Sequence, residues 1–294
     1  MSSSHVATTQ GPRTYTTPRW VKILSGILVV VIAASAYPAF TEENHKPGIA
    51  DFFPSAIFGS GTFFEFNRMA LARVVSGIVV CLIFGIAASR LRLVPGRGQS
   101  LVELGADFVR KQVGIEVLGE AAGRRWAPLL GFIFFGVLAM NITGIVPGIN
   151  IAASSVMAVP LVFALISWVV FIGAGIKEQG LGHFFKTQLF PAGVPKPLYL
   201  LLTPIEAFST FVVRPATLAI RLLANMISGH LLLSITFFGT SAMLAAAPAM
   251  KGIAILTIGS TFIVTLFELF IAVLQSYIFA ILTAVYIMLS VQEH

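Results

Sequence analysis

Six long apolar segments constrain the fold of this 294-residue chain more than any other feature of its sequence. Each is long enough for a membrane-spanning helix, which needs about 20 residues. Charged residues make up 11% of the chain, whereas soluble proteins carry about 25%. We therefore expect an all-α integral membrane protein with about five to six membrane helices. The segments cover residues 21–40, 69–89, 126–147, 156–176, 198–238 and 253–291.

The first segment is open to two interpretations. Arg13, Arg19 and Lys22 stand before or at the start of the apolar run, and the triplet 34–36 (Ala-Ser-Ala) resembles a cleavage site, as in a secretory signal peptide. Residues 1–19 would, however, make an unusually long leader. Residues 1–40 are thus either cleaved or retained as an extra transmembrane helix.

Basic residues are distributed unevenly between the two sides of the predicted membrane. With the N-terminus inside, thirteen of the nineteen Lys and Arg residues fall on the inner side, and the outer loops keep Lys46, Arg68 and Lys251. The positive-inside rule then places both termini inside, with six crossings. These loops explain the net charge of +7, so we expect a lipid bilayer and no nucleic acid as a partner. The inner residues are Arg13, Arg19, Lys22, Arg90, Arg92, Arg97, Arg110, Lys111, Arg124, Arg125, Lys177, Lys186 and Lys196.

Residues 99–123 have a different pattern, in which apolar and charged side chains alternate with helical spacing. Leu101, Leu104, Phe108 and Ile115 recur along one side, and charged residues lie between them. This predicts an amphipathic helix along the cytoplasmic membrane surface. A loop helix packed on its own protein is the alternative.

The last two segments are too long for upright crossings. As helices, 203–238 and 255–291 would measure about 54 and 55 Å, whereas the hydrocarbon core is about 30 Å thick. They must therefore break or lie strongly tilted. Pro204 suits a helix start and Pro215 a kink, and no proline interrupts 253–294. We expect a tilted antiparallel hairpin with a short outer loop at about 245–251.

Polar residues within this hairpin pair by depth. A charged side chain within an apolar span is expensive and is usually retained for function, and the guanidinium of Arg221 stays protonated at any accessible pH. In an antiparallel hairpin, residues at one level have a constant sum of their numbers. Arg221 and Gln275 add up to 496, and His230 and Glu268 to 498. Each pair should therefore share a level, with the second pair nearer the outside.

Helical phase separates these residues into two groups. At about 100° per residue, His230 lies on the opposite side of its helix from Arg221. A histidine and a carboxylate in contact exchange protons near neutral pH, so His230 and Glu268 are candidates for a proton relay. The predicted polar faces are Thr257, Thr261, Glu268, Gln275 and Tyr286 on the last helix, and Arg214, Thr217, Arg221, Asn225 and Ser228 on the helix before it.

The motifs around these residues closely resemble subunit a of the F-type ATP synthase. Residues 213–215 (VRP) and 218–231 (LAIRLLANMISGHL) resemble its signature, and 268–279 (ELFIAVLQSYIF) its last helix. Residues 140–147 (MNITGIVP) resemble its third-span motif. The resemblance runs from about residue 64 to the C-terminus and divides the chain into an N-terminal extension, 1–64, and a channel domain, 65–294.

The resemblance implies the stator of a rotary proton motor. Such a subunit faces a ring of c subunits, each with a membrane-embedded carboxylate, which two offset half-channels reach from opposite sides. Arg221 would separate the half-channels and attract the deprotonated ring carboxylate, with Gln275 beside it. Asn225, His230 and Glu268 would line the outer, entry half-channel, and Glu206 the inner, exit side.

The resemblance also implies partners and a location. The partners would be the c ring, b-type subunits of the peripheral stalk and the rest of the ATP synthase, in a bacterial plasma membrane with the C-terminus in the cytoplasm. The sequence has no GxxxxGK[ST] phosphate-binding motif. We therefore expect a non-catalytic subunit without cofactor or metal, and ATP chemistry in other subunits.

A secondary transporter with a midplane ion or substrate site is the alternative function. It predicts internal repeats with broken helices in matching halves. The intramembrane charges of this chain lie in one C-terminal hairpin instead. A membrane scaffold without transport is a further alternative, and it leaves Arg221, His230 and Glu268 unexplained.

Overall fold

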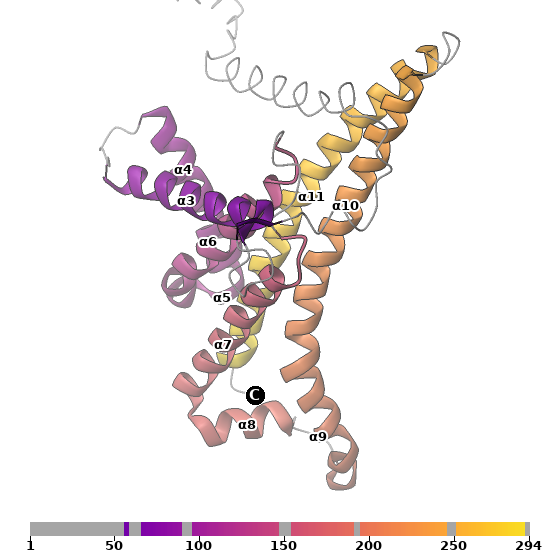
Figure 1. The fold of residues 1–294 in the computed structure, drawn as a ribbon. Coiled ribbons are helices and arrows are strands. Elements are labelled where there is room, and N and C mark those ends of the chain that lie inside the picture. Colours follow the sequence, from indigo (N-terminus) through magenta and orange to yellow (C-terminus); the bar gives the residue numbers. More distant parts are fainter. Residues whose placement is uncertain are drawn as a thin grey trace, which may run out of the picture.

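The computed structural model describes residues 56–58, 66–89, 96–146, 154–190, 195–245 and 251–291 (Figure 1). From Arg68 onward the described residues form an all-α membrane protein, as the sequence predicts, and a short antiparallel pair of strands precedes them. The strands are β1 (Ala56–Phe58) and β2 (Phe66–Asn67). The helices are α3 (Arg68–Ser89), α4 (Arg97–Phe108), η2 (Val109–Ile115), α5 (Glu116–Leu118), α6 (Glu120–Ile142), α7 (Ala158–Gln179), α8 (Leu181–Leu189), η3 (Lys196–Leu198), α9 (Tyr199–Phe208), η4 (Ser209–Val213), α10 (Arg214–Ala245) and α11 (Lys251–Val291).

Five stretches of the described chain are long and apolar enough to cross a membrane. They are α3, α6, α7, the continuous run from α9 through α10, and α11. The first predicted segment, 21–40, and residues 246–250 of the predicted outer loop at about 245–251 lie outside the described residues. The predicted boundary at 64/65 falls between β1 and β2, which pair with each other, so the division into two domains stays a prediction.

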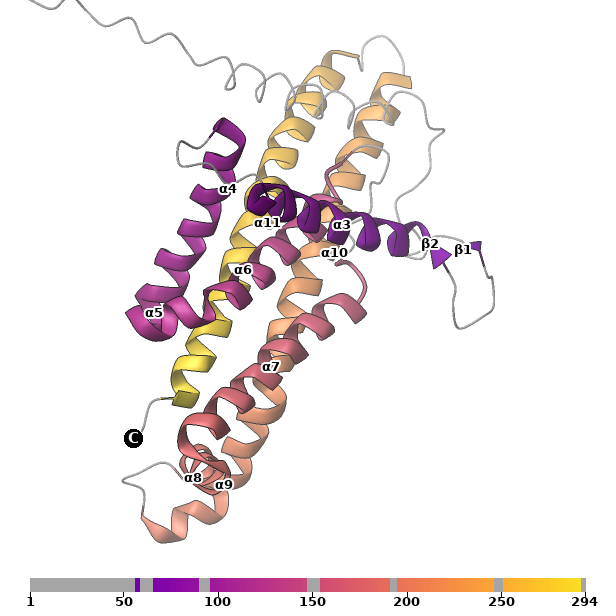
Figure 2. The same cartoon turned by 90° about the vertical axis from the view of Figure 1, so that its left-hand side faces the viewer.

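The two C-terminal helices run side by side in opposite directions (Figure 1). The run from Tyr199 to Ala245 has 47 residues and α11 has 41, so at 1.5 Å per residue they measure about 70 and 62 Å. The 22 residues of α3 measure about 33 Å and match a direct crossing of the bilayer. Figure 2 shows α3 lying across the long axis of the pair. The pair is therefore strongly tilted in the membrane.

The prolines of this run act differently from the sequence prediction. The helix starts at Tyr199, after the short turn η3, and Pro204 lies inside α9 rather than at a helix start. Where the sequence predicts a kink at Pro215, the structure has the π-helix η4, which ends two residues before this proline. Proline has no N–H for the carbonyl four residues earlier, and a π-helix shifts the hydrogen bonds to a longer spacing. The helix therefore continues past Pro215.

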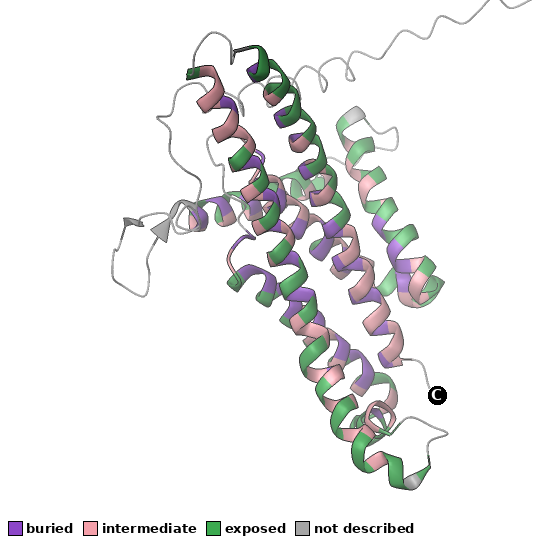
Figure 3. Cartoon of the chain, turned by 90° about the vertical axis from the view of Figure 1, so that its right-hand side faces the viewer, coloured by how far each residue is buried: buried purple, intermediate pink, exposed green. Residues whose placement is uncertain are grey.

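The core lies where α6, α7, α10 and α11 meet. Leu130, Ile133, Leu222 and Phe279 are fully buried there. Figure 3 shows buried positions concentrated between the helices and exposed positions along their outer faces. Small residues let membrane helices approach closely, and four buried alanines do so here: Ala164, Ala219, Ala280 and Ala284.

The amphipathic helix predicted at 99–123 is shorter, and it packs on the protein along half of its length. It runs from α4 through η2 to α5 and ends at Leu118, because Gly119 turns the chain with a positive φ of 79°. Residues 120–123 begin α6, which therefore starts six residues before the predicted Trp126. In η2, Val109 and Val113 are buried in the main core. The predicted membrane-surface side keeps Leu101 and Leu104 of α4 exposed, by 58% and 71%.

Candidate functional site

Arg221 lies midway along α10 with its side chain exposed. Among the residues that the structure describes, no hydrogen bond or ion pair engages its guanidinium. Its neighbours within two turns on the same exposed face are Thr217, Ala224 and Ser228, all short side chains. An unpaired charge on a membrane helix is costly. Arg221 is therefore a charge left without an ion-pair partner among the described residues.

Asn225 and Gln275 join α10 to α11 one turn beyond Arg221. The Nδ2 of Asn225 donates a hydrogen bond to the Oε1 of Gln275 at 2.8 Å. Gln275 is 1% exposed, and its Nε2 has no hydrogen-bond partner among the described residues. Gln275 therefore lies near the level of Arg221, as the antiparallel spacing predicts, but it is held by Asn225.

Glu268 is buried between the same two helices, nearer the hairpin tip, which we define by Ala245 and Lys251. Its carboxylate lies against the α-carbon of Gly229, in the space where any other residue would carry a Cβ. Its Oε1 is buried without a hydrogen-bond partner in the described chain. Gly229 precedes His230, so Glu268 and His230 come to the level that the sequence predicts for them.

Asn225, Gln275 and Glu268 form a line of polar residues between α10 and α11, which we call the polar seam. Threonines extend the polar seam from Glu268 toward the hairpin tip. Thr265 and Thr261 follow at helical spacing on α11, and the hydroxyl of Thr261 lies 3.3 Å from that of Thr240 on α10. All three are buried. Thr261 belongs to the polar face predicted for the last helix, whereas Thr240 and Thr265 were not predicted. The sum of residue numbers could have identified Thr240, because Thr240 and Thr261 add up to 501, close to the sums of the predicted pairs.

Glu206 forms a second polar group at the opposite end of α10. Its Oε1 lies 3.7 Å from Nη2 of Arg214 and accepts a hydrogen bond from Thr210 Oγ1 at 3.5 Å. Eight residues of regular α-helix would place Glu206 and Arg214 about 80° apart. The π-helix η4 between them takes up about one extra residue. The pair then behaves like residues seven apart, which share a face.

The described residues contain no group of three His, Cys, Asp or Glu side chains that could hold a metal ion.

The structure gathers five of the predicted site residues, Arg221, Asn225, His230, Glu268 and Gln275, along the middle of the α10–α11 pair. It places Glu206 apart from them, at the α9 end.

Comparison with known proteins matches residues 70–288 to the family model of the ATP synthase A chain. The chain is 40% identical over 258 residues to ATP synthase subunit a of Rhodococcus erythropolis, which covers 86% of this chain and 93% of that protein. It is 42% identical over 222 residues to ATP synthase subunit a of Frankia alni, covering 75% and 76%. The protein of the same name from Streptomyces lividans is 35% identical, covering 85% and 88%. The chain belongs to the ATP synthase subunit a family.

The subunit a family match contains every predicted site residue and the five membrane-crossing stretches, apart from the first and last few residues of the outermost helices. The resemblance inferred from the motifs at 218–231 and 268–279 is therefore confirmed. This member of the subunit a family is a multi-pass membrane protein.

Proposed function

We propose that the chain is the proton-conducting stator subunit of a rotary F-type ATP synthase. One observation carries this proposal: Arg221 is an exposed, unpaired cation on the membrane helix α10. A guanidinium does not release its proton, so Arg221 does not relay protons itself. It attracts an anion carried on another polypeptide, the carboxylate of a c-ring subunit, and separates two half-channels.

The outer half-channel follows the polar seam between α10 and α11. It leads from the threonines near the hairpin tip to Glu268 and His230, and then to the Asn225–Gln275 pair beside Arg221. Glu268 and His230 carry the proton in this route, because a carboxylate and an imidazole both exchange protons near neutral pH. The buried, unbonded Oε1 of Glu268 supports this role, since structural carboxylates are normally hydrogen-bonded.

The inner half-channel opens at the other end of α10. Glu206 receives protons that leave the ring there. Its partly exposed carboxylate, near Thr210 and Arg214, supports this placement. Protons would then cross the membrane only with a rotating ring carboxylate, and Arg221 would prevent direct passage between the half-channels.

The proposed partners fit the exposed surfaces. The c ring contacts the face of α10 that carries Arg221, Ala224 and Ser228. Peripheral-stalk b-type subunits contact the side of α4 that exposes Leu101 and Leu104. The chain is non-catalytic, ATP chemistry takes place in other subunits, and the complex lies in a bacterial plasma membrane with the C-terminus of this chain in the cytoplasm.

ATP-driven proton pumping in membrane vesicles tests the proposal. We expect Arg221→Ala to abolish pumping, because the barrier between the half-channels and the attraction for the ring carboxylate are both lost. Arg124→Ala is the matched control, since Arg124 is exposed and paired with Glu120 on the surface of the protein. Normal pumping in the Arg221→Ala vesicles would refute the proposal.

A further inference from the structure

The short helix α8 lies across the α9 end of the molecule, between the end of α7 and the start of α9 (Figure 1). Phe184 of α8 is fully buried, and its ring occupies the place of a Cβ at Gly175 of α7. The Nε2 of Gln188 donates a hydrogen bond of 3.4 Å to the carbonyl oxygen of Leu289, near the end of α11. The last carbonyls of a helix have no partner within it. Helix α8 is therefore fixed to two membrane helices.

Helix α8 also contacts the run from α9 through η4 at two points. The Oγ1 of Thr203 on α9 donates a hydrogen bond of 3.3 Å to the carbonyl oxygen of Leu189. Further along, the ring of Phe211 in η4 packs on the ring of Phe185, with 5.7 Å between their centroids and 31° between their planes. Eight residues of regular α-helix would place Thr203 and Phe211 about 80° apart. Both face α8, because η4 begins between them and its wider turns reduce this angle.

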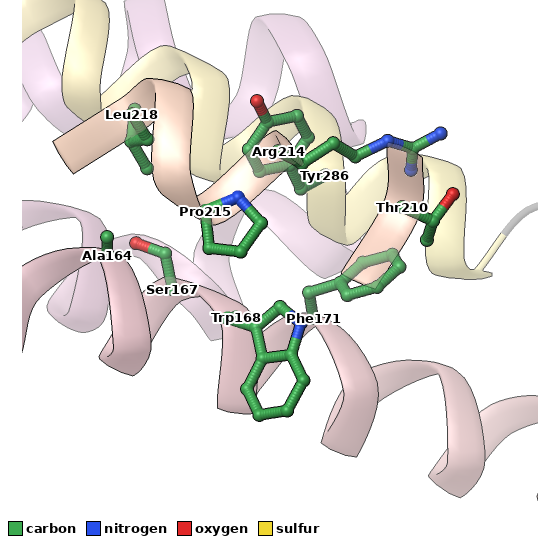
Figure 4. A pocket seen from close by; sticks show the side chains of 9 residues that line it. All are labelled: Ala164, Ser167, Trp168, Phe171, Thr210, Arg214, Pro215, Leu218 and Tyr286. Carbon is green, nitrogen blue, oxygen red and sulfur yellow. The ribbon is translucent and has the colours of Figure 1, made fainter. Parts of the chain in front are cut away.

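The same wider turns bring Glu206 to Arg214, on the other side of η4. Thr210 of η4 is fully buried and donates a hydrogen bond to Glu206. Figure 4 shows Thr210 and the guanidinium of Arg214 at the same end of a cavity between α7, α10 and α11. A π-helix is rare, so it needs neighbours that fit it better than they would fit a regular helix. Phe211 has such a neighbour in Phe185.

We propose that α8 maintains the π-helix η4, and that Phe185 is the positioning residue through which it acts. The ring of Phe185 holds Phe211, and η4 then keeps the carboxylate of Glu206 beside Arg214. Without this ring, η4 can take up the hydrogen bonds of a regular helix, which would turn Glu206 and Arg214 about 80° apart. The inference deepens the function proposed above and rests on it, because Glu206 lies in the proposed inner half-channel. Phe185 itself does not touch the proton route.

Electron cryo-microscopy structures of the intact ATP synthase test this geometry directly. The carboxylate of Glu206 now lies 3.7 Å from Nη2 of Arg214. We expect Phe185→Ala to turn η4 into regular helix and to separate the pair beyond about 4 Å, the limit of an ion pair. Phe211→Ala removes the other ring and serves the same test where Phe185→Ala does not assemble. A π-helix and an ion pair that both survive these changes would overturn the proposal.

Phe190→Ala is the matched control. Phe190 directly follows α8, and its ring packs on Tyr199 at 5.5 Å between centroids. Tyr199 lies at the start of α9, before η4. Phe190→Ala therefore removes an aromatic contact between the same two parts of the chain without touching η4, and it should leave the Glu206–Arg214 pair in place. Loss of the pair in Phe190→Ala would show that any loosening of α8 has this effect, and it would overturn the assignment to Phe185.

ATP-driven proton pumping tests whether this geometry serves the proposed function. We expect Phe185→Ala to slow pumping severalfold, and Phe185→Tyr, which keeps a ring against Phe211, to pump near the wild-type rate. If Phe185→Tyr is as slow as Phe185→Ala, positioning by the ring is wrong. Normal pumping by Phe185→Ala with a separated pair would instead remove Glu206 from the proton route. The proposed exit route would then fail, whereas the control of η4 by α8 would stand.

Discussion

Asn225 and Gln275 face each other across α10 and α11, joined by a 2.8 Å hydrogen bond from Nδ2 to Oε1. This hydrogen bond links α10 to α11 one turn from Arg221. It holds the buried amide of Gln275 at a fixed depth between the two helices.

The coupling between these two amides is measurable. We expect Asn225→Leu and Gln275→Leu each to destabilise the subunit by about 1–3 kcal/mol, because each leaves the other amide of this part-buried hydrogen bond without its partner. The double variant should lose less than the sum of the two, since no unpaired amide remains. Heating the complex and recording the temperature at which the subunit dissociates checks this. Strictly additive shifts would show that the bond carries no coupling.

Gly229 is required by the position of Glu268. The carboxylate of Glu268 occupies the place of a Cβ at Gly229, so Gly229→Ala should displace Glu268 and slow proton pumping. Gly239→Ala is the matched control, because a Cβ there meets nothing within 4 Å on the same helix. Equal pumping rates for the two variants would place Glu268 elsewhere than against Gly229.

His230 and Glu268 should act as one relay. Each single exchange, His230→Glu or Glu268→His, leaves two groups of the same kind and should slow pumping strongly. The double exchange restores one acid and one imidazole, so we expect it to pump faster than either single variant. A double variant that pumps no better than the singles would refute the coupling.

The amphipathic helix that runs from α4 through η2 to α5 is anchored by a close backbone approach between Gly123 and η2. A Cβ at Gly123 would lie 2.6 Å from the α-carbon of Ile115 and 2.7 Å from the carbonyl oxygen of Gly114. Because these are backbone atoms, Gly123→Ala should cost about 1–3 kcal/mol of stability through overpacking. Gly131→Ala, on the same helix α6 with nothing within 4 Å of its Cβ, should leave the dissociation temperature nearly unchanged. Similar temperatures for both variants would contradict the close packing.

The sequence was sufficient to predict the hairpin and the depth of its polar residues. Membrane-spanning helices contain few polar residues, so those present are easy to identify. In an antiparallel pair of helices, residues at the same level have residue numbers with a nearly constant sum. The observed contacts of Asn225 with Gln275 and of Thr240 with Thr261 have sums of 500 and 501, which exceed the predicted sums of 496 and 498 by two to five.

The Glu206–Arg214 pair could not be predicted in this way. In a regular helix these residues point about 80° apart, and only the π-helix η4 brings them onto one face. The position of a π-helix depends on tertiary packing around Pro215, which spacing rules do not contain. Spacing rules likewise did not predict the end of the amphipathic helix α4–η2–α5, which is set by the positive φ of Gly119.

The distance between the Arg221 guanidinium and the nearest carboxylate of a neighbouring subunit, measured in a structure of the assembled ATP synthase, tests the central claim most directly. We predict that a c-ring carboxylate comes within ion-pair distance, about 4 Å, in at least one rotary position. A guanidinium directed into lipid, with no acid from another polypeptide near it in any position, would contradict the account.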